Sequence, residues 1–465
     1  MISQDNGMCR CPDFFITFVI NKRDAPLKSD IMLKKIIITL AGLMPLTAAA
    51  AQNSPYQAIV AADGSGDYRT VSEAIAAVPT GLSSPWRILV KSGDYDEHIV
   101  IPADKPYIHL IGQDKKTTAI RHKMNHGQKA MESGRFDNSA YWEYSYNNPD
   151  GKCAGMDKAV VVVNAPDFYS DGISYINDWG REAWSGPQAL AFYGNADRHA
   201  LKDCAFISFQ DTWRTPDRAD TRTYARDCYV EGAVDYMYGG GDVLVENSTF
   251  YNVRSGSVIV APNHNGEKWG YVIKDCVIDG NEEARDGKQK LGRPWQGNPR
   301  TVYINTTMLI PVAPAGWDDM GAIPALFAEY NSHDRQGKPL DLSGRKSHYQ
   351  TKKRKDGSVL TGESRTQISA DEAATYTYEA VIRPDEGWDP RAMMTSLPAV
   401  KNLMYSDGAL RWDAVKGAIG YVVFDGDDII GTVTETSFPI SKVNRAIRVR
   451  PVNEAGSMGR MALLR

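Results

Sequence analysis

Three stretches of the sequence share one pattern: Lys202-Asp203-Cys204-Ala205-Phe206, Arg226-Asp227-Cys228-Tyr229-Val230 and Lys274-Asp275-Cys276-Val277-Ile278. Two variants are Glu246-Asn247-Ser248-Thr249-Phe250 and Ile304-Asn305-Thr306-Thr307-Met308. In each stretch an Asp or Asn precedes a small residue, and apolar residues flank the pair. The pattern returns every 20 to 30 residues. An internal repeat of this length is typical of a solenoid, in which each coil packs on its neighbours.

The segments between the repeats favour strands because they are rich in β-branched and aromatic residues. They include Val160-Val161-Val162-Val163, Val243-Leu244-Val245, Val258-Ile259-Val260, Tyr271-Val272-Ile273 and Val302-Tyr303-Ile304. The sequence therefore predicts a parallel β-helix. We expect Cys204, Cys228 and Cys276 to stack in its core, because no CxxC pair or His spacing supports a zinc site. The sequence fixes no disulfide pairing.

Coil length also brings polar residues together. Asp211 and Asp235 are 24 residues apart, and Gln188 and Gln210 are 22 apart, each close to one coil. Neighbouring strands lie about 4.7 to 4.9 Å apart, so we expect these four side chains to stack in a column. Two carboxylates this close do not ionise together easily: one pKa rises and the other stays low. Such a pair suits acyl or glycosyl chemistry.

Composition sets broad limits on the function. With 465 residues, of which 42% are hydrophobic, the chain can bury a large core and carry more than one domain. Its net charge of −4 gives no global basic field, which argues against nucleic acid as a partner. An acidic ligand would have to be bound by local cations.

Residues 1–51 are predicted to be a leader. Met32 opens a short basic segment, an apolar run extends from Ile36 to Leu46, and small residues at 47–51 supply a cleavage site before Gln52. This is the pattern of a signal peptide, and translation is expected to begin at Met32. The apolar run is too short for a membrane span, which needs about 20 residues. We therefore expect a secreted or periplasmic protein.

The C-terminal part of the chain changes character from Leu397. Its predicted strands are Leu410-Arg411-Trp412-Asp413, Tyr421-Val422-Val423-Phe424, Ile429-Ile430-Gly431-Thr432-Val433 and Ala446-Ile447-Arg448-Val449-Arg450. They resemble a fibronectin type III module, although residues 397–465 are few for a full sandwich of about 100. Before it, the polar segment 334–364 is expected to be a solvated loop, and Ser369 is expected to begin a helix that packs on the solenoid.

A further set of motifs follows one order along the chain. The motifs are Val60-Ala61-Ala62-Asp63-Gly64-Ser65-Gly66-Asp67-Tyr68, Gly93-Asp94-Tyr95-Asp96-Glu97, Gln188-Ala189-Leu190-Ala191, Gln210-Asp211-Thr212, Gly232-Ala233-Val234-Asp235-Tyr236-Met237-Tyr238-Gly239, Leu291-Gly292-Arg293-Pro294-Trp295, Gly316-Trp317 and Glu329-Tyr330. Each motif alone is weak. Their ordered combination, over roughly residues 56–392, resembles the pectinesterase (pectin methylesterase) family.

The resemblance implies hydrolysis of the methyl esters of galacturonate units in pectin, with release of methanol and pectate and without a cofactor or metal. Asp235 would be the nucleophile, and Asp211 the acid that protonates methanol and then the base that activates water. Gln188 and Gln210 would face the oxyanion, and Arg293 would pair with Asp235.

The resemblance also implies sugar contacts by Trp295, Tyr238 and Trp213. The chain departs from the family near these positions. Tyr236-Met237-Tyr238 stands where the family usually has Phe-Ile-Phe, and Trp213-Arg214 where Leu-Tyr is common. The catalytic set is intact, so the departures concern the preferred methylation pattern. An insertion within residues 121–158, which includes Tyr141-Trp142-Glu143-Tyr144-Ser145-Tyr146, is expected either to stack on sugars or to form a structural flap.

Other enzyme classes lack their motifs. The chain has no Gly-His-Gly of polygalacturonases, no evident calcium-binding acid ladder of pectate lyases and no GxSxG of serine esterases. An esterase or thioesterase with another substrate, or a non-catalytic glycan-binding protein on the same scaffold, remains the alternative. The predicted architecture is all-β, with a right-handed parallel β-helix over residues 52–392 and a small β-sandwich over 397–465. We expect a monomer that binds pectin, without nucleic acid or a membrane span.

Overall fold

The computed structural model describes residues 54–125, 159–186, 188–353, 357–385, 387–444 and 446–464. The predicted leader, Cys153 and the aromatic run from Tyr141 to Tyr146 lie outside the described residues. The chain divides into two units, Met1–Ala49 and Ala50–Arg465, and the fold below is that of the second.

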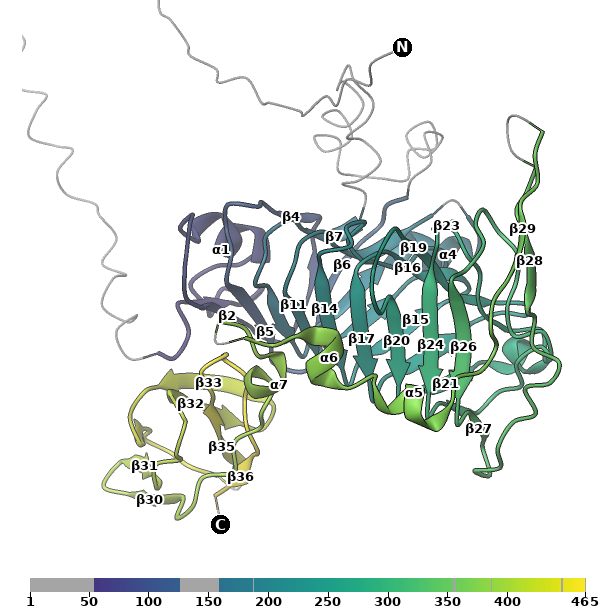
Figure 1. Cartoon of the computed structure of the whole chain (residues 1–465). Coiled ribbons are helices and arrows are strands. Elements are labelled where there is room, and N and C mark those ends of the chain that lie inside the picture. Colours follow the sequence, from purple (N-terminus) through teal and green to yellow (C-terminus); the bar gives the residue numbers. More distant parts are fainter. Residues whose placement is uncertain are drawn as a thin grey trace, which may run out of the picture. The chain divides into compact units, whose positions relative to one another are not determined.

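Most of the described chain forms the predicted right-handed parallel β-helix, in which each full coil contributes a strand to each of three sheets (Figure 1). Sheet A contains β1 (Ala58–Val60), β2 (Trp86–Val90), β5 (Ile108–Gly112), β8 (Tyr169–Asp171), β11 (His199–Lys202), β14 (Arg222–Arg226), β17 (Asp242–Glu246), β20 (Tyr271–Lys274), β24 (Arg300–Ile304) and β26 (Leu326–Tyr330).

Sheet B follows sheet A in each coil. It contains β3 (Gly93–Asp96), β6 (Thr118–His122), β9 (Ser174–Asn177), β12 (Ala205–Ile207), β15 (Tyr229–Gly232), β18 (Thr249–Asn252), β21 (Val277–Gly280), β25 (Thr307–Met308) and β27 (His333–Asp334). Sheet C completes the coil with β4 (Ile99–Ile101), β7 (Ala159–Val163), β10 (Leu190–Gly194), β13 (Trp213–Arg214), β16 (Val234–Gly239), β19 (Val258–His264) and β22 (Lys290–Gly292), and β23 (Gln296–Gly297) pairs with β19. The five strands predicted between the repeats are β7, β17, β19, β20 and β24, which confirms them.

The Asp or Asn of the sequence repeat forms the bend between sheet A and sheet B. Its backbone is left-handed in successive coils, with φ of 48° at Asp203, 58° at Asp227, 49° at Asn247, 55° at Asp275, 53° at Asn305 and 52° at Asn331. Asn and Asp adopt this conformation more readily than other residues that carry a Cβ. The small residue that follows is buried in each case, and the free cysteines Cys204, Cys228 and Cys276 are core residues as expected. The repeat therefore encodes a bend followed by a stacked small side chain.

Aromatic rings fill the interior of the solenoid. Phe206 stacks on Tyr175 at 5.6 Å between ring centroids and on Trp213 at 4.9 Å. Helix α1 (Val71–Ala77) packs beside β1 and β4 and begins with a capping box between Thr70 and Glu73.

The outer face of sheet A is covered by the C-terminal part of the chain (Figure 1). Three short helices, α5 (Ala370–Ala374), α6 (Tyr378–Ile382) and α7 (Pro390–Met393), supply apolar side chains to a shared cluster. In that cluster Val381 and Ile382 pack with Leu244 of β17, and Arg391 forms an ion pair with Glu246 at 2.9 Å. The predicted helix at Ser369 is confirmed as α5, whose N-cap is Ser369.

The last strands form two antiparallel sheets around a core that includes Leu410, Trp412 and Val449. One sheet contains β30 (Met404–Ser406), β31 (Ala409–Arg411) and β34 (Ser437–Pro439). The other contains β32 (Gly420–Asp425), β33 (Asp428–Val433), β35 (Ile447–Val452) and β36 (Ala462–Leu463). A buried hydrogen bond of 2.6 Å between the hydroxyls of Tyr169 and Ser457 ties this region to sheet A.

The segment 334–364 is not the solvated loop that its polarity predicts. It contains an antiparallel hairpin of β28 (His348–Gln350) and β29 (Thr361–Glu363), and Tyr349 of β28 is buried in the solenoid core. Arg345 is also buried, because it forms a 2.6 Å ion pair with the fully buried Glu329. A buried ion pair between distant positions leaves no periodic signal in the sequence, which explains the wrong expectation.

The bend residues allow a test of the repeat. Asn247 is exposed and has a left-handed backbone, so Asn247→Val should lower the free energy of unfolding by about 1–2 kcal/mol. Asn247→Gly should stay within about 0.5 kcal/mol of the parent, because glycine adopts this conformation freely. Equilibrium urea unfolding of the three proteins measures both values. If the valine variant were as stable as the parent, the assignment of a left-handed backbone to Asn247 would be contradicted.

Candidate active site

The two aspartates predicted to share a column lie on adjacent coils, where sheet C begins. The backbone N–H of Asp211 donates to the carbonyl of Val234 at 2.9 Å, and Gln210 pairs with Val234 as an isolated parallel bridge. Asp211 and Asp235 both have left-handed backbones, with φ of 62° and 49°. Such conformations cost roughly 1–3 kcal/mol each and concentrate at functional sites. The sheet register also shifts between Val234 and Met237, and an irregularity of this kind redirects side chains.

Arg293 pairs with Asp235 as the resemblance implies. Its Nε donates to Oδ1 at 2.8 Å and its Nη2 to Oδ2 at 2.6 Å, so both carboxylate oxygens are bound by one guanidinium fork. Burial alone would lower the pKa of Arg293, but the hydrogen bonds and charge of Asp235 outweigh that effect and raise it. Asp235 is only 5% exposed, so its oxygens are fixed in orientation and screened from bulk water.

Asp211 has the opposite electrostatic environment. Burial raises its pKa well above the ordinary value, and the charge of Asp235 raises it further. A hydrogen bond from Gln210 and the charges of Arg214 and Arg293 oppose the shift without cancelling it. The site thus places a carboxyl group that retains its proton beside a carboxylate paired with arginine. That is the division into acid and nucleophile expected of a coupled pair.

The two glutamines lie on neighbouring coils. Gln188 directly precedes Ala189, whose N–H donates to the carbonyl of Gln210 at 3.0 Å, so the two amides occupy neighbouring coils. A Cβ added at Gly186 would lie 2.9 Å from Oε1 of Gln210, so the loop before Gln188 packs against the Gln210 amide. The backbones of Gln188 and Gln210 thus have the one-coil spacing that the predicted column requires.

Outward-facing aromatic residues adjoin the column on one side. Tyr238 and Trp295 meet edge to face at 5.6 Å between ring centroids. They form one apolar cluster with Tyr193 and Leu190 on the outer face of sheet C. Tyr238 is buried in this cluster and Trp295 is only partly buried, so Trp295 is the ring that a ligand at the column could reach.

The expectation that Trp213 contacts a ligand is corrected. Trp213 is 1% exposed and pairs with Phe192 and Met237 in a row that points into the solenoid core. Side chains alternate along a strand, so the next residue, Arg214, points outward. Its neighbours across the sheet are Tyr193 and Tyr238.

Several residues near the column were not selected from the sequence. Tyr193 and Arg214 belong to the outward row. Arg214 is one coil from Tyr238 and Tyr193 is one coil from Arg214, so the coil spacing could have revealed both. On the other flank, Phe209 precedes Gln210 and contacts Trp184, which is 42% exposed, at 5.2 Å between ring centroids. No sequence spacing connects Trp184 with this site, because it follows the short helix α4 (Asp178–Ala183).

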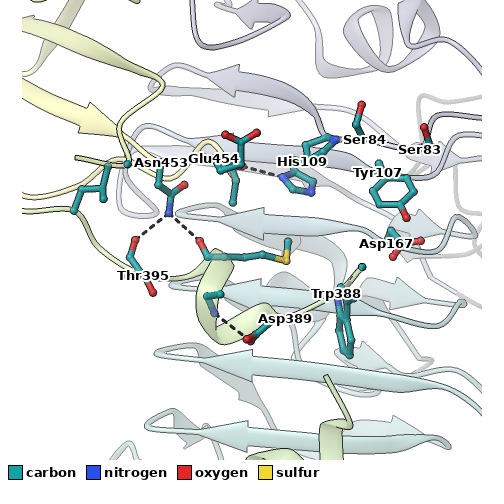
Figure 2. Close-up of a pocket in the computed structure, with 17 residues that line it drawn as sticks. Ser83, Ser84, Tyr107, His109, Asp167, Trp388, Asp389, Thr395, Asn453 and Glu454 are labelled. Atoms are coloured by element: carbon teal, nitrogen blue, oxygen red, sulfur yellow. Dashed lines mark hydrogen bonds between the residues drawn. The ribbon is translucent and has the colours of Figure 1, made fainter. Parts of the chain in front are cut away.

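A separate cavity of about 630 Å³ lies where sheet A, α7 and the C-terminal strands meet (Figure 2). Its lining includes Ser83, Ser84, Tyr107, His109, Asp167, Trp388, Asp389, Thr395, Asn453 and Glu454. Its charged lining residues are acidic, and burial lowers the pKa of His109 to about 4, so this histidine is neutral at pH 7. The cavity contains none of the predicted site residues and is poorly suited to an anionic ligand.

Among the described residues, His, Cys, Asp and Glu side chains form no group of three or more that could hold a metal ion. In the same part of the chain, no helix combines the length and apolar character needed to cross a membrane.

Comparison with known proteins gives a consistent set of relatives. A family model described as Pectinesterase matches residues 57–141 and 144–367. Pectinesterase 31 of Arabidopsis thaliana is 30% identical over 283 residues, which cover 58% of this chain and 80% of that protein. The chain spans only 32% and 46% of the length of two longer Arabidopsis thaliana relatives, each with pectinesterase and pectinesterase inhibitor in its name.

Solved structures share the fold. The pectin methylesterase from carrot superposes with a TM-score of 0.55 at 24% identity, covering 70% of this chain and 93% of the carrot enzyme. A pectin methylesterase in complex with a hexasaccharide superposes with a TM-score of 0.53 at 22% identity, covering 72% of this chain and 98% of the other. At these identities the likeness concerns the parallel β-helix itself.

The raised pKa of Asp211 predicts a pH-dependent stability effect. In the unfolded chain this carboxyl has an ordinary pKa of about 4, so it loses its proton at pH values where the folded chain still keeps it. The stability of the fold therefore falls as the pH rises from the unfolded pKa to the folded pKa. Asp211→Asn has no proton to lose. The difference in melting temperature, variant minus parent, should therefore be larger at pH 7.5 than at pH 4, by on the order of 1–3 °C. Thermal melts at both pH values measure the gain.

Asp227→Asn is the matched control for that comparison, since Asp227 is also an aspartate with a left-handed backbone but lies at a bend between sheets A and B. Its melting temperature should follow the parent's across the same pH range. A pH-independent difference for Asp211→Asn, or a gain that shrinks as pH rises, would contradict the raised pKa.

Proposed function

Because the chain belongs to the pectinesterase family, we propose that it removes methyl esters from galacturonate units of pectin and releases methanol and pectate. The observation that carries this proposal is the pairing of a buried Asp211, whose pKa is raised well above the ordinary value, with an Asp235 carboxylate held by Arg293. An ester needs a nucleophile, a proton donor for the departing alkoxide and donors for an oxyanion. The column contains side chains suited to each of these tasks.

In the first half-reaction the Asp235 carboxylate attacks the C6 carbonyl carbon of the ester. The electron pair of the C=O bond moves to the oxygen, and the amide N–H groups of Gln188 and Gln210 stabilise the oxyanion. When the oxyanion collapses, the bond to the methoxy oxygen breaks and Asp211 gives that oxygen its proton. Methanol leaves, and an anhydride joins Asp235 to the galacturonate unit.

In the second half-reaction Asp211 is ionised and acts as a base. It takes a proton from water while the water oxygen attacks the acyl carbon of the anhydride. The bond to Asp235 breaks and restores its carboxylate, and Asp211 is again protonated. The new galacturonic acid loses its proton to solvent, so each turnover consumes one ester and one water and yields methanol, a carboxylate and a proton.

Sugar binding is assigned to the outward aromatic cluster. Trp295 and Tyr238 would pack against galacturonate rings, with the buried Tyr193 packed in the same cluster. A solved pectin methylesterase binds a hexasaccharide. By analogy, the groove of this chain would run across neighbouring coils of sheet C and contact several sugar units.

The domain limits and cellular context are also proposals. Residues 52–392 would form the catalytic domain, with residues 1–51 as a leader that begins in effect at Met32. Residues 397–465 would form a fibronectin type III-like module, and the two antiparallel sheets around one core support this. The protein would act as a monomer on pectin after export to the periplasm or beyond.

The nucleophile is tested by Asp235→Asn. Loss of the carboxylate should lower kcat for methanol release from highly methylated pectin by about 10³-fold or more, because the acyl intermediate cannot form. Asp235→Ala guards against recovery of activity by deamidation and should behave alike. Methanol is measured directly, and circular dichroism checks that each variant is folded.

Asp227→Asn again serves as the control, because it makes the same exchange at a left-handed aspartate away from the column. It should retain kcat within about two-fold. More than a tenth of parental activity in folded Asp235→Ala would remove Asp235 from the mechanism. A parent that releases no methanol from any methylated galacturonan would overturn the proposed function.

A further inference from the structure

Arg214 lies in the outward row of sheet C, between two tyrosines. Its guanidinium carbon is 4.7 Å from the ring centroid of Tyr193 and 5.5 Å from that of Tyr238. The Arg214 side chain is only 12% exposed. The aromatic faces therefore hold the cation in place at the surface of the proposed groove.

The position of Arg214 couples it to the catalytic column. It is three residues beyond Asp211, and its charge lowers the pKa of Asp211, although burial and Asp235 prevail. Tyr238, its neighbour on β16, contacts Trp295 of the proposed sugar-binding surface. A group bound by Arg214 would therefore lie beside the unit that reacts, not in a remote part of the solenoid.

The hydrogen bonds of Arg214 are incomplete. Its Nη2 donates to Asp217, and its enclosed Nε has no hydrogen-bond partner. A guanidinium has five N–H donors in a planar fork, which matches a carboxylate better than any neutral ester. Asp217 is 31% exposed, and its bond to Nη2 occupies one of these five donors.

Acidic groups dominate the surroundings otherwise. Asp211, Asp217 and Asp235 all influence this part of sheet C, and Arg293 is already bound by Asp235 through two hydrogen bonds. A substrate carboxylate approaching the column would find Arg293 already bound by Asp235, so another cation would have to meet it. Arg214 is the cation held in the aromatic row beside them.

We propose that Arg214 binds the free carboxylate of a galacturonate unit adjacent to the unit whose ester is cleaved, and so sets a preference for partly demethylated substrate. This inference rests on the proposed function and specifies its substrate. A methylated neighbour would present only neutral ester oxygens to Arg214, which accept weaker hydrogen bonds than a carboxylate. The side chain thus discriminates between two forms of the same polymer.

The test compares two hexagalacturonates, one fully methyl-esterified and one with half of its units free. The ratio of kcat/KM for the mixed substrate to kcat/KM for the full ester is measured for the parent and for Arg214→Gln. The glutamine keeps a polar side chain and removes the charge. The ratio should fall by about ten-fold or more, in line with the loss of a charged hydrogen bond.

Asp217→Asn is the matched variant, because it removes the opposing charge from the same ion pair. Its ratio should equal or exceed that of the parent. If the kcat/KM ratio of Asp217→Asn fell as far as that of Arg214→Gln, the ion pair would only maintain the local structure. That result would overturn the inference. Equal losses on both substrates in Arg214→Gln, or a parent without preference, would overturn it as well.

A binding measurement separates this inference from the catalytic proposal. Calorimetry with unesterified hexagalacturonate needs no turnover, and the Kd should rise by about ten-fold or more in Arg214→Gln. If the parent releases no methanol but this change in Kd appears, the esterase proposal fails and carboxylate recognition stands. If the parent is an esterase and the Kd does not change, the inference about Arg214 fails alone.

Discussion

The stacking of coils in register is the constraint on which the rest of the structure depends. Residues one coil apart lie about 4.8 Å from each other when they share an orientation, so any side chain repeated at that interval becomes part of a row. The left-handed Asp or Asn at the bend between sheets A and B keeps successive coils alike. On the inner face of sheet C, one row of side chains helps to fill the interior: Phe192, Trp213, Met237 and Val260. The same register places Tyr193, Arg214 and Tyr238 side by side on the outside.

The register places two aspartates side by side in a buried position, which carboxylates ordinarily avoid. Burying two aspartates on adjacent coils is costly unless their charges are compensated. Arg293 compensates Asp235 through both of its oxygens, while Asp211 avoids the cost by retaining its proton, as its raised pKa indicates. One fixed arrangement thus gives two residues of the same type different electrostatic environments. The left-handed backbone at both positions is part of this arrangement, because a regular strand would alternate the side chains between core and surface.

The sequence predicted most of this arrangement wherever a period carried the information. The repeat of Asp203, Asp227 and Asn247 identified the solenoid, and the intervals between Gln188, Gln210, Asp211 and Asp235 identified the column. The role of Trp213 was wrong because strand β13 has only two residues, too few to reveal alternation by themselves. The Arg345–Glu329 ion pair and the hairpin near it were missed because they join positions without a shared interval. The catalytic roles came from the family resemblance, because no interval in the sequence distinguishes a nucleophile from an acid.

The C-terminal part of the chain shows how stability and the candidate site are separated by face. Helices α5 to α7 and the strands beyond them cover the outer face of sheet A with apolar side chains, including Val381, Ile382 and Val422. Sheet A is therefore buried on both faces, which suits its parallel strands. Sheet C instead presents rings, an arginine and the acid pair on its outer side. Because each sheet draws on different positions of the same coil, substitutions on the outer face of sheet C can alter ligand preference while the covered face of sheet A maintains the fold.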